Sequence, residues 1–121
     1  MRAFGILLLV SFLIGCGQKP VSYHDQIEPI LKNRCVSCHG FDNPAAKIAL
    51  TSYENLMSSK TARFKKSIVI AGNPSESWLY LRSGTEQPHF RMPPDTVSTT
   101  PLSKDEIELV RKWIQQGAKD N

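Results

Sequence analysis

The sequence lacks an apolar run long enough to cross a membrane as a helix. Its longest run, residues 4–14 (FGILLLVSFLI), has eleven residues. At about 1.5 Å per residue this is far short of a hydrocarbon layer of about 30 Å. A large excess of charge of one sign is also missing, because 15 basic and 11 acidic residues leave a formal net charge of only +4. So mild a balance argues against a nucleic-acid partner.

Cysteine is scarce, and strand signals are missing. The three cysteines are Cys16, Cys35 and Cys38, an odd number for an exported protein whose cysteines all pair. We find no strong alternating strand pattern, internal repeat or low-complexity tract. The chain is therefore predicted to form one all-α domain with long loops over residues 23–121, preceded by an address segment.

The N-terminal segment has the features of an export signal. The apolar run follows Arg2 and leads into Leu13-Ile14-Gly15-Cys16. This ending resembles the lipobox of bacterial lipoproteins, which implies a signal peptide over residues 1–15, cleavage before Cys16 and lipidation of the Cys16 thiol. The alternative is an ordinary signal peptide in which Cys16 is incidental.

The lipoprotein resemblance also implies a location. Residues 16–22, with Pro20, would form a lipidated tether that lifts the domain off the lipid surface. The protein would be exported and anchored to a bacterial membrane, facing the periplasm or the cell exterior. Gly17 stands where an aspartate commonly retains lipoproteins in the inner membrane, which favours the outer membrane.

Helical spacing and helix boundaries predict four helices. Ile27, Ile30 and Leu31 favour a helix over residues 24–33, in which Pro29 marks either the regular start or a kink. A capping box at Thr51 and Glu54 would open a short helix that ends near residue 57. Residues 76–82 form the third predicted helix.

The last predicted helix has the clearest boundaries. Ser103 and Glu106 form a capping box, and Gly117 stands at the C′ position, so the helix should span residues 104–116. The preceding stretch, residues 83–101, contains four prolines and is predicted to be a loop. So few helices give a thin core, and something besides the polypeptide is expected to fill the interior.

Residues 35–39 (CVSCH) carry the C-x-x-C-H attachment signature of c-type haem. The Cys35 and Cys38 thiols are spaced to add to the two vinyl groups of one porphyrin, and the His39 imidazole then lies beneath the iron. Two alternatives use the same residues: a disulfide or thioredoxin-like redox pair, and a zinc site. The redox fold needs a preceding strand, and the zinc site lacks an obvious fourth ligand, so one covalently attached haem c is the predicted cofactor.

A six-coordinate electron-transfer haem needs a second ligand from far along the chain. Met92 is the preferred candidate, since a thioether favours the ferrous state and two following prolines restrict the backbone. His89 is the alternative ligand, and an open position is a third possibility. Met57 is interpreted as a core or haem-contact residue.

These residues, taken together, resemble the planctomycete-type cytochrome c domain, a relative of class I cytochromes c. The resemblance implies a small helical fold wrapped around one haem, thioethers at Cys35 and Cys38, His39 as proximal ligand and Met92 as distal ligand. Residues 43–47 lack the paired glycines that we associate with the family at this place. The motifs that carry the resemblance are Arg34-Cys35-x-x-Cys38-His39-Gly40, Gly72-Asn73-Pro74, Met92-Pro93-Pro94 and Trp113-Ile114-x-x-Gly117-Ala118.

The predicted function is that of a membrane-anchored single-electron carrier, a monomer and not an enzyme. The alternative is a haem-based sensor or small-ligand-binding protein with a labile sixth ligand. Redox proteins are the expected partners. An acidic partner could be steered by the basic stretch Lys60, Arg63, Lys65 and Lys66, although a merely solvated face is the competing interpretation.

Overall fold

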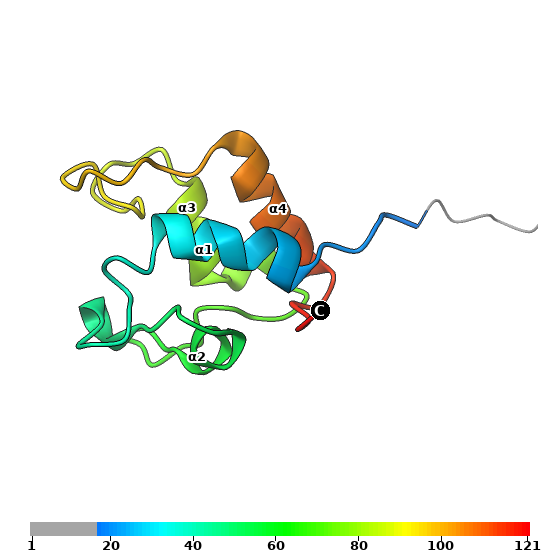
Figure 1. Cartoon of the computed structure of the whole chain (residues 1–121), viewed down its shortest axis with the longest axis horizontal. Coiled ribbons are helices and arrows are strands. Elements are labelled where there is room, and N and C mark those ends of the chain that lie inside the picture. Colours follow the sequence, from blue (N-terminus) through cyan, green and yellow to red (C-terminus); the bar gives the residue numbers. More distant parts are fainter. Residues whose placement is uncertain (1–16) are drawn as a thin grey trace, which may run out of the picture.

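The computed structural model describes residues 17–121, so the predicted signal peptide and Cys16 lie outside the described residues. This part of the chain is helical, and its only strand-like pairing is an isolated bridge between Lys60 and Ser67. The all-α prediction is therefore confirmed. The elements shown in Figure 1 are, in chain order, η1 (Tyr23–Ile27), α1 (Glu28–Arg34), η2 (Ala45–Lys47), α2 (Tyr53–Ser58), η3 (Pro74–Glu76), α3 (Trp78–Gly84) and α4 (Lys104–Gln115).

The first predicted helix is confirmed, and the role of its proline is now defined. The regular helix α1 begins at Glu28 with Pro29 in its first turn, where a missing backbone N–H leaves no hydrogen bond unmade. Before it, η1 is one wider π-helical turn capped by the Ser22 side chain. The spacing of apolar residues cannot distinguish a π-helical turn from the α-helix into which it runs.

The predicted cap of the second helix is wrong by one residue. Ser52, not Thr51, accepts the hydrogen bond from the Asn55 amide at 3.2 Å and opens α2. The Thr51 hydroxyl instead accepts from the Asn55 side chain at 2.8 Å. Both residues are of types that cap helices, so their order in the sequence alone does not decide between them.

The third and fourth helices lie close to their predicted ranges. α3 starts at Trp78, two residues later than predicted, because Pro74–Glu76 forms the separate 3₁₀ turn η3. The Ser103 and Glu106 capping box of α4 is present in both directions. At the other end Ala118 N–H donates to Trp113 O and Gly117 N–H to Ile114 O, which is a Schellman motif with Gly117 at φ +104°.

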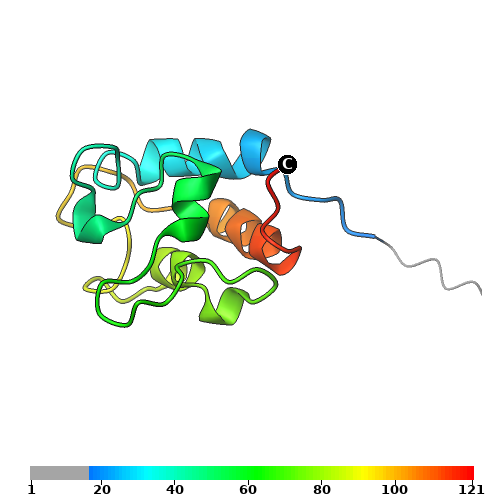
Figure 2. The same cartoon turned by 90° about the horizontal axis from the view of Figure 1, so that it is seen from below.

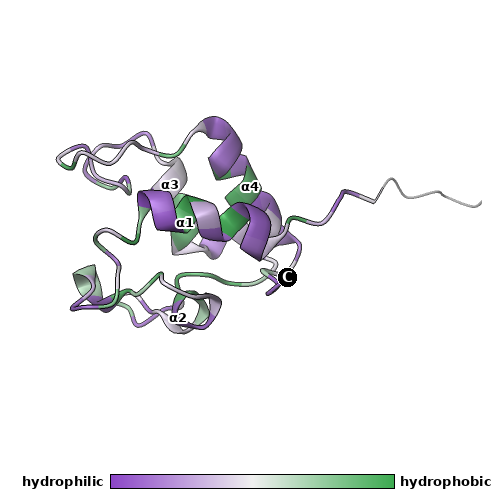
Figure 3. Cartoon of the chain, viewed as in Figure 1, coloured by the Kyte–Doolittle hydropathy of each residue, from purple (hydrophilic) through white to green (hydrophobic). Residues whose placement is uncertain are grey.

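The hydrophobic core lies between η1, α1 and α4, and residues from α2, α3 and the segments beside them complete it. Figure 2 shows α4 lying between α1 and α3, and Figure 3 shows hydrophobic residues within both α1 and α4. Trp113 is buried among Tyr23 and Tyr53 and donates its ring N–H to Lys119 O, so it is a core residue. The largest fully buried hydrophobic side chains are Tyr23, Ile27, Leu31, Leu56, Val110, Trp113 and Ile114.

The segment predicted as a free tether lies against the domain. Val21 N–H donates to the Gln116 side chain at 2.8 Å, and Gln116 in turn donates to Lys19 O at 3.3 Å. The Tyr23 amide and the Ser22 hydroxyl both donate to Asn121, at 3.0 and 2.9 Å. Residues 19–23 and the C-terminus therefore form one end of the molecule.

Two core tyrosines provide a stability test with opposite signs. The Tyr23 hydroxyl is buried and has no hydrogen-bond partner among residues 17–121, and burial raises its pKa to about 12, so it stays protonated at neutral pH. The Tyr53 hydroxyl donates to Ala118 O at 2.8 Å. Tyr23→Phe should raise the free energy of unfolding by about 1 kcal/mol, whereas the matched Tyr53→Phe should lower it by about 1 kcal/mol. Denaturant titration checks this, and equal losses for both variants would contradict it.

Candidate functional site

The C-x-x-C-H residues form a hydrogen-bonded turn directly after the end of α1. Cys35 N–H donates to Leu31 O at 2.9 Å, and His39 N–H donates to Cys35 O at 2.9 Å. Residues three and four positions apart come close together in such a turn. The turn therefore brings Cys35, Cys38 and His39 close to one another.

The two thiols differ in environment. Cys35 packs against the core, and burial raises the pKa of its thiol to about 12, whereas Cys38 is exposed. Both are free cysteines. A thioredoxin-like pair depends on one thiol with a lowered pKa, whereas the pKa of Cys35 is raised. Burial therefore makes Cys35 the less reactive thiol of the two.

The His39 ring is held by a contact that the sequence did not predict. Its Nδ1 lies 3.0 Å from Ile48 O. When Nδ1 carries the proton and donates to this carbonyl, the Nε2 lone pair is free to bind a metal. A backbone carbonyl has no signature in the sequence, so no residue pattern could have identified Ile48.

The loop that supplies this carbonyl folds back on the motif. Leu50 N–H donates to His39 O, and Ala45 N–H donates to Cys38 O, both at 2.9 Å. Within it Asn43, Ala46 and Lys47 have φ values of 48°, 54° and 58°, the left-handed region that glycine adopts most readily. These three residues lie in the stretch, residues 43–47, that lacks the family's paired glycines, so other residues adopt the left-handed conformation here.

Met92 lies on the proline-bearing loop, which is fastened to α3. Its amide donates to Arg82 O at 2.9 Å, and the Arg82 guanidinium donates to Phe90 O at 2.9 Å while lying over the rings of Trp78 and Phe90. The Met92 side chain is 39% exposed, and Pro93 beside it is buried. The predicted loop over residues 83–101 is confirmed from Thr85 onward, whereas Ser83 and Gly84 belong to α3.

The motif and the proline-bearing loop extend from the same end of the helical core. Figures 1 and 2 both show the segments around residues 35–50 and 85–101 on the side away from the C-terminus. Phe41 and Phe90, on these two segments, are 82% and 55% exposed. His89 is exposed on the second segment, whereas Met57 packs against the core. Met92 and His89, the two predicted candidates for the distal ligand, therefore both lie on the segment at this end of the helical core.

Arg91, the residue before Met92, has a buried donor without a partner. Its Nε has no hydrogen-bond acceptor within the described chain, while another nitrogen of the same guanidinium pairs with Asp95. An unpaired buried N–H is costly, and a carboxylate would satisfy it. Haem carries two propionate carboxylates. The two neighbouring cysteines, the oriented imidazole and this donor all fit a haem c.

The described residues contain no set of side chains that could bind zinc. Among residues 17–121 no three His, Cys, Asp or Glu side chains come together so that they could hold a metal ion. Zinc sites need three or four such ligands.

Comparison with known proteins decides the family. A family model described as Planctomycete cytochrome C matches residues 35–96, just over half of the chain. This chain belongs to the planctomycete cytochrome c family. The match begins at the first motif cysteine and runs past Met92, so it contains the haem motif and the methionine-proline-proline element. No curated protein and no solved structure matches the cytochrome.

Membership establishes the general role. A cytochrome c domain binds haem and carries electrons; such domains are generally exported and typically are not enzymes. Within residues 17–121 of this cytochrome, none of the helices has the length and apolar character needed to span a membrane.

Proposed function

We propose that this cytochrome is a monohaem single-electron carrier. Cys35 and Cys38 form the two thioethers, His39 is the proximal ligand of the iron, and Met92 is the distal ligand. The observation that carries the proposal is the tight turn that brings both cysteines close to a histidine whose ring is already oriented by Ile48 O. When bound, the haem supplies a one-electron couple at its iron.

Residues of the chain set the properties of this redox couple. The His39 bond to Ile48 O fixes the ring and raises its basicity as a ligand. The Met92 thioether favours the reduced state. The Arg91 Nε, which is buried without a partner in the described residues, would donate to a propionate of the bound haem and so anchor the loop that carries Met92. None of these groups acts on a substrate.

A specific observation favours the second candidate, a haem-based sensor or small-ligand-binding protein. The Met92 side chain is 39% exposed and belongs to a loop without helix. A ligand on such a loop is more easily displaced than one on a packed element. In that case a gas would compete with Met92 for the iron.

The same proposal includes export and a lipid anchor at Cys16, with the outer membrane favoured. It is supported by the lipobox-like LIGC and by the contacts of Lys19, Val21 and Tyr23 with the C-terminal residues. With these contacts the anchored end lies opposite the two loops that carry the ligands (Figure 1). The haem of a monomer would then face away from the membrane, toward redox partners.

A potentiometric titration tests the carrier role. The purified cytochrome should titrate as one couple with a one-electron slope, and its reduced spectrum should be that of a low-spin haem c. Catalytic turnover of peroxide by the same sample would contradict the proposal, because turnover requires an open iron and acid-base groups beside it.

A further inference from the structure

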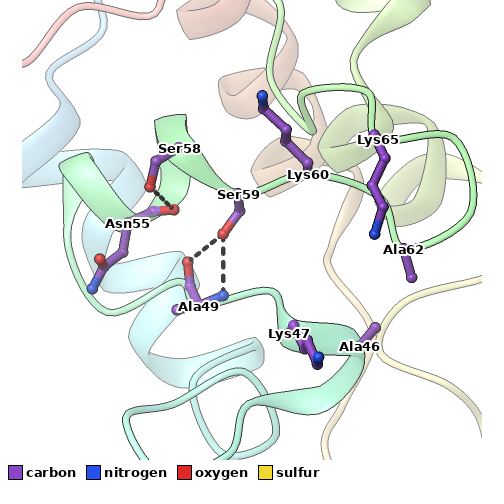
Figure 4. Close-up of a pocket in the computed structure, with 9 residues that line it drawn as sticks. All are labelled: Ala46, Lys47, Ala49, Asn55, Ser58, Ser59, Lys60, Ala62 and Lys65. Atoms are coloured by element: carbon purple, nitrogen blue, oxygen red, sulfur yellow. Dashed lines mark hydrogen bonds between the residues drawn. The ribbon is translucent and has the colours of Figure 1, made fainter.

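A surface cavity of about 560 Å³ lies beside the loop that holds His39. It is bounded by η2, the C-terminal end of α2 and the hairpin that follows (Figure 4). Three lysines and no carboxylate line it. Its lining residues are Ala46, Lys47, Ala49, Asn55, Ser58, Ser59, Lys60, Ala62 and Lys65.

The positive charge of this cavity is not compensated by the chain. Within residues 17–121, Lys47, Lys60 and Lys65 take part in no ion pair. The hairpin that carries two of them is ordered, with the bridge between Lys60 and Ser67 and a bond from the Thr61 amide to Lys66 O at 2.8 Å. Fixed, unpaired cations raise the local concentration of anions.

A continuous line of bonds joins this cavity to the proximal ligand. His39 Nδ1 contacts Ile48 O at 3.0 Å, and that carbonyl belongs to the peptide group whose nitrogen is Ala49 N. Ala49 N–H donates to the Ser59 hydroxyl at 3.1 Å, and the same hydroxyl donates back to Ala49 O at 3.1 Å. Figure 4 shows these two bonds across the cavity wall. Two hydrogen bonds and one peptide group therefore separate the His39 ring from Ser59.

We propose that this lysine-lined cavity is the docking surface for an acidic redox protein, on the proximal side of the haem. The inference rests on the proposed carrier function. One electron passes between the cytochrome and a partner centre of opposite redox state, one being oxidised as the other is reduced, with no covalent bond made or broken. The bonds from His39 to Ser59 couple the iron ligand to the docked face.

The spread of the charges favours a protein over a small anion. Figure 4 shows the Lys65 side chain reaching toward Ala62, while the Lys60 side chain extends in the opposite direction. On the same hairpin Phe64 is 57% exposed, with the Arg63 guanidinium 5.2 Å from its ring centre. Aromatic and arginine side chains are enriched in protein interfaces.

The test uses the haem-loaded cytochrome and a matched pair of charge reversals. Lys47→Glu with Lys65→Glu changes the cavity, and Lys19→Glu with Lys119→Glu makes the same change in net charge at the other end. Rates of electron transfer to an oxidised acidic blue-copper protein are measured by stopped flow at low and high salt. Binding of poly-L-glutamate is measured by calorimetry. We expect the cavity pair to lower both rate and affinity about tenfold at low salt, and the control pair less than twofold.

Each other outcome overturns the proposal. Equal losses for both pairs would mean that only net charge matters. Saturation by inorganic phosphate, with no preference for the polymer, would mean a small-anion pocket. If neither pair changes rate or affinity while the spectrum and the one-electron titration are unchanged, docking at this face fails and the carrier function stands.

Discussion

Replacing Cys35 and Cys38 together with alanine should abolish covalent haem and most of the stability of the domain. The thioethers are predicted to form only at these thiols, and the core of the described chain is small. A cofactor that binds only the folded state contributes about 4 kcal/mol at a thousandfold excess over its dissociation constant, and a variant that loses its haem loses a contribution of this order. Haem absorbance that survives denaturation and acid extraction measures attachment, and a thermal unfolding curve measures stability.

The matched control for this change is Ser37→Ala. Ser37 is exposed between the two cysteines and has no predicted bond to the haem. Its variant should keep full attachment and unfold within about 0.5 kcal/mol of the parent. Haem that stays covalently bound to the double cysteine variant would show that these thiols are not the attachment points.

Replacing Met92 with alanine should open the distal side of the iron. The loop stays fastened through the Met92 amide bond to Arg82 O, so the variant loses the thioether without losing the fold. The weak sulfur-to-iron absorption of the ferric protein should vanish, and the reduced protein should bind carbon monoxide at least about tenfold more tightly than the parent. Absorption spectra with a carbon monoxide titration measure both.

Two further variants make the ligand assignment decisive. Met57→Ala removes a thioether that packs against the core, so it should lower stability and leave the spectrum unchanged. His89→Ala should leave the absorption band in place. If His89→Ala opens the iron and Met92→Ala does not, His89 is the distal ligand. If the parent already binds carbon monoxide as readily as Met92→Ala, the sensor alternative holds.

The fold was predictable wherever local signals agreed. The capping box at Ser103 and Glu106 and the glycine at position 117 mark the ends of α4: the predicted start is confirmed, and the helix ends at Gln115, one residue before the predicted end. At α2 two neighbouring capping residues competed, and the prediction chose the wrong one. At the N-terminal side the contacts of residues 19–23 depend on Gln116 and Asn121, about a hundred positions away. No local pattern reports such a distant contact.

The site was predictable to the extent that its chemistry depends on side chains in a fixed local spacing. The C-x-x-C-H motif led to the family, which the comparison confirms. The Ile48 carbonyl that orients His39 and the unpaired Nε of Arg91 were not predictable, because each depends on how a loop folds in space. Ligation by His39 and Met92 stays a prediction.

The intact mass and absorption spectrum of the mature protein test the central claim most directly. The cytochrome is expressed with its own N-terminal segment in a bacterium that matures c-type cytochromes and lipoproteins. The account predicts a red protein whose mass equals a chain that begins at Cys16, plus its acyl groups and one covalently bound haem. A folded, colourless protein at the bare peptide mass would contradict it.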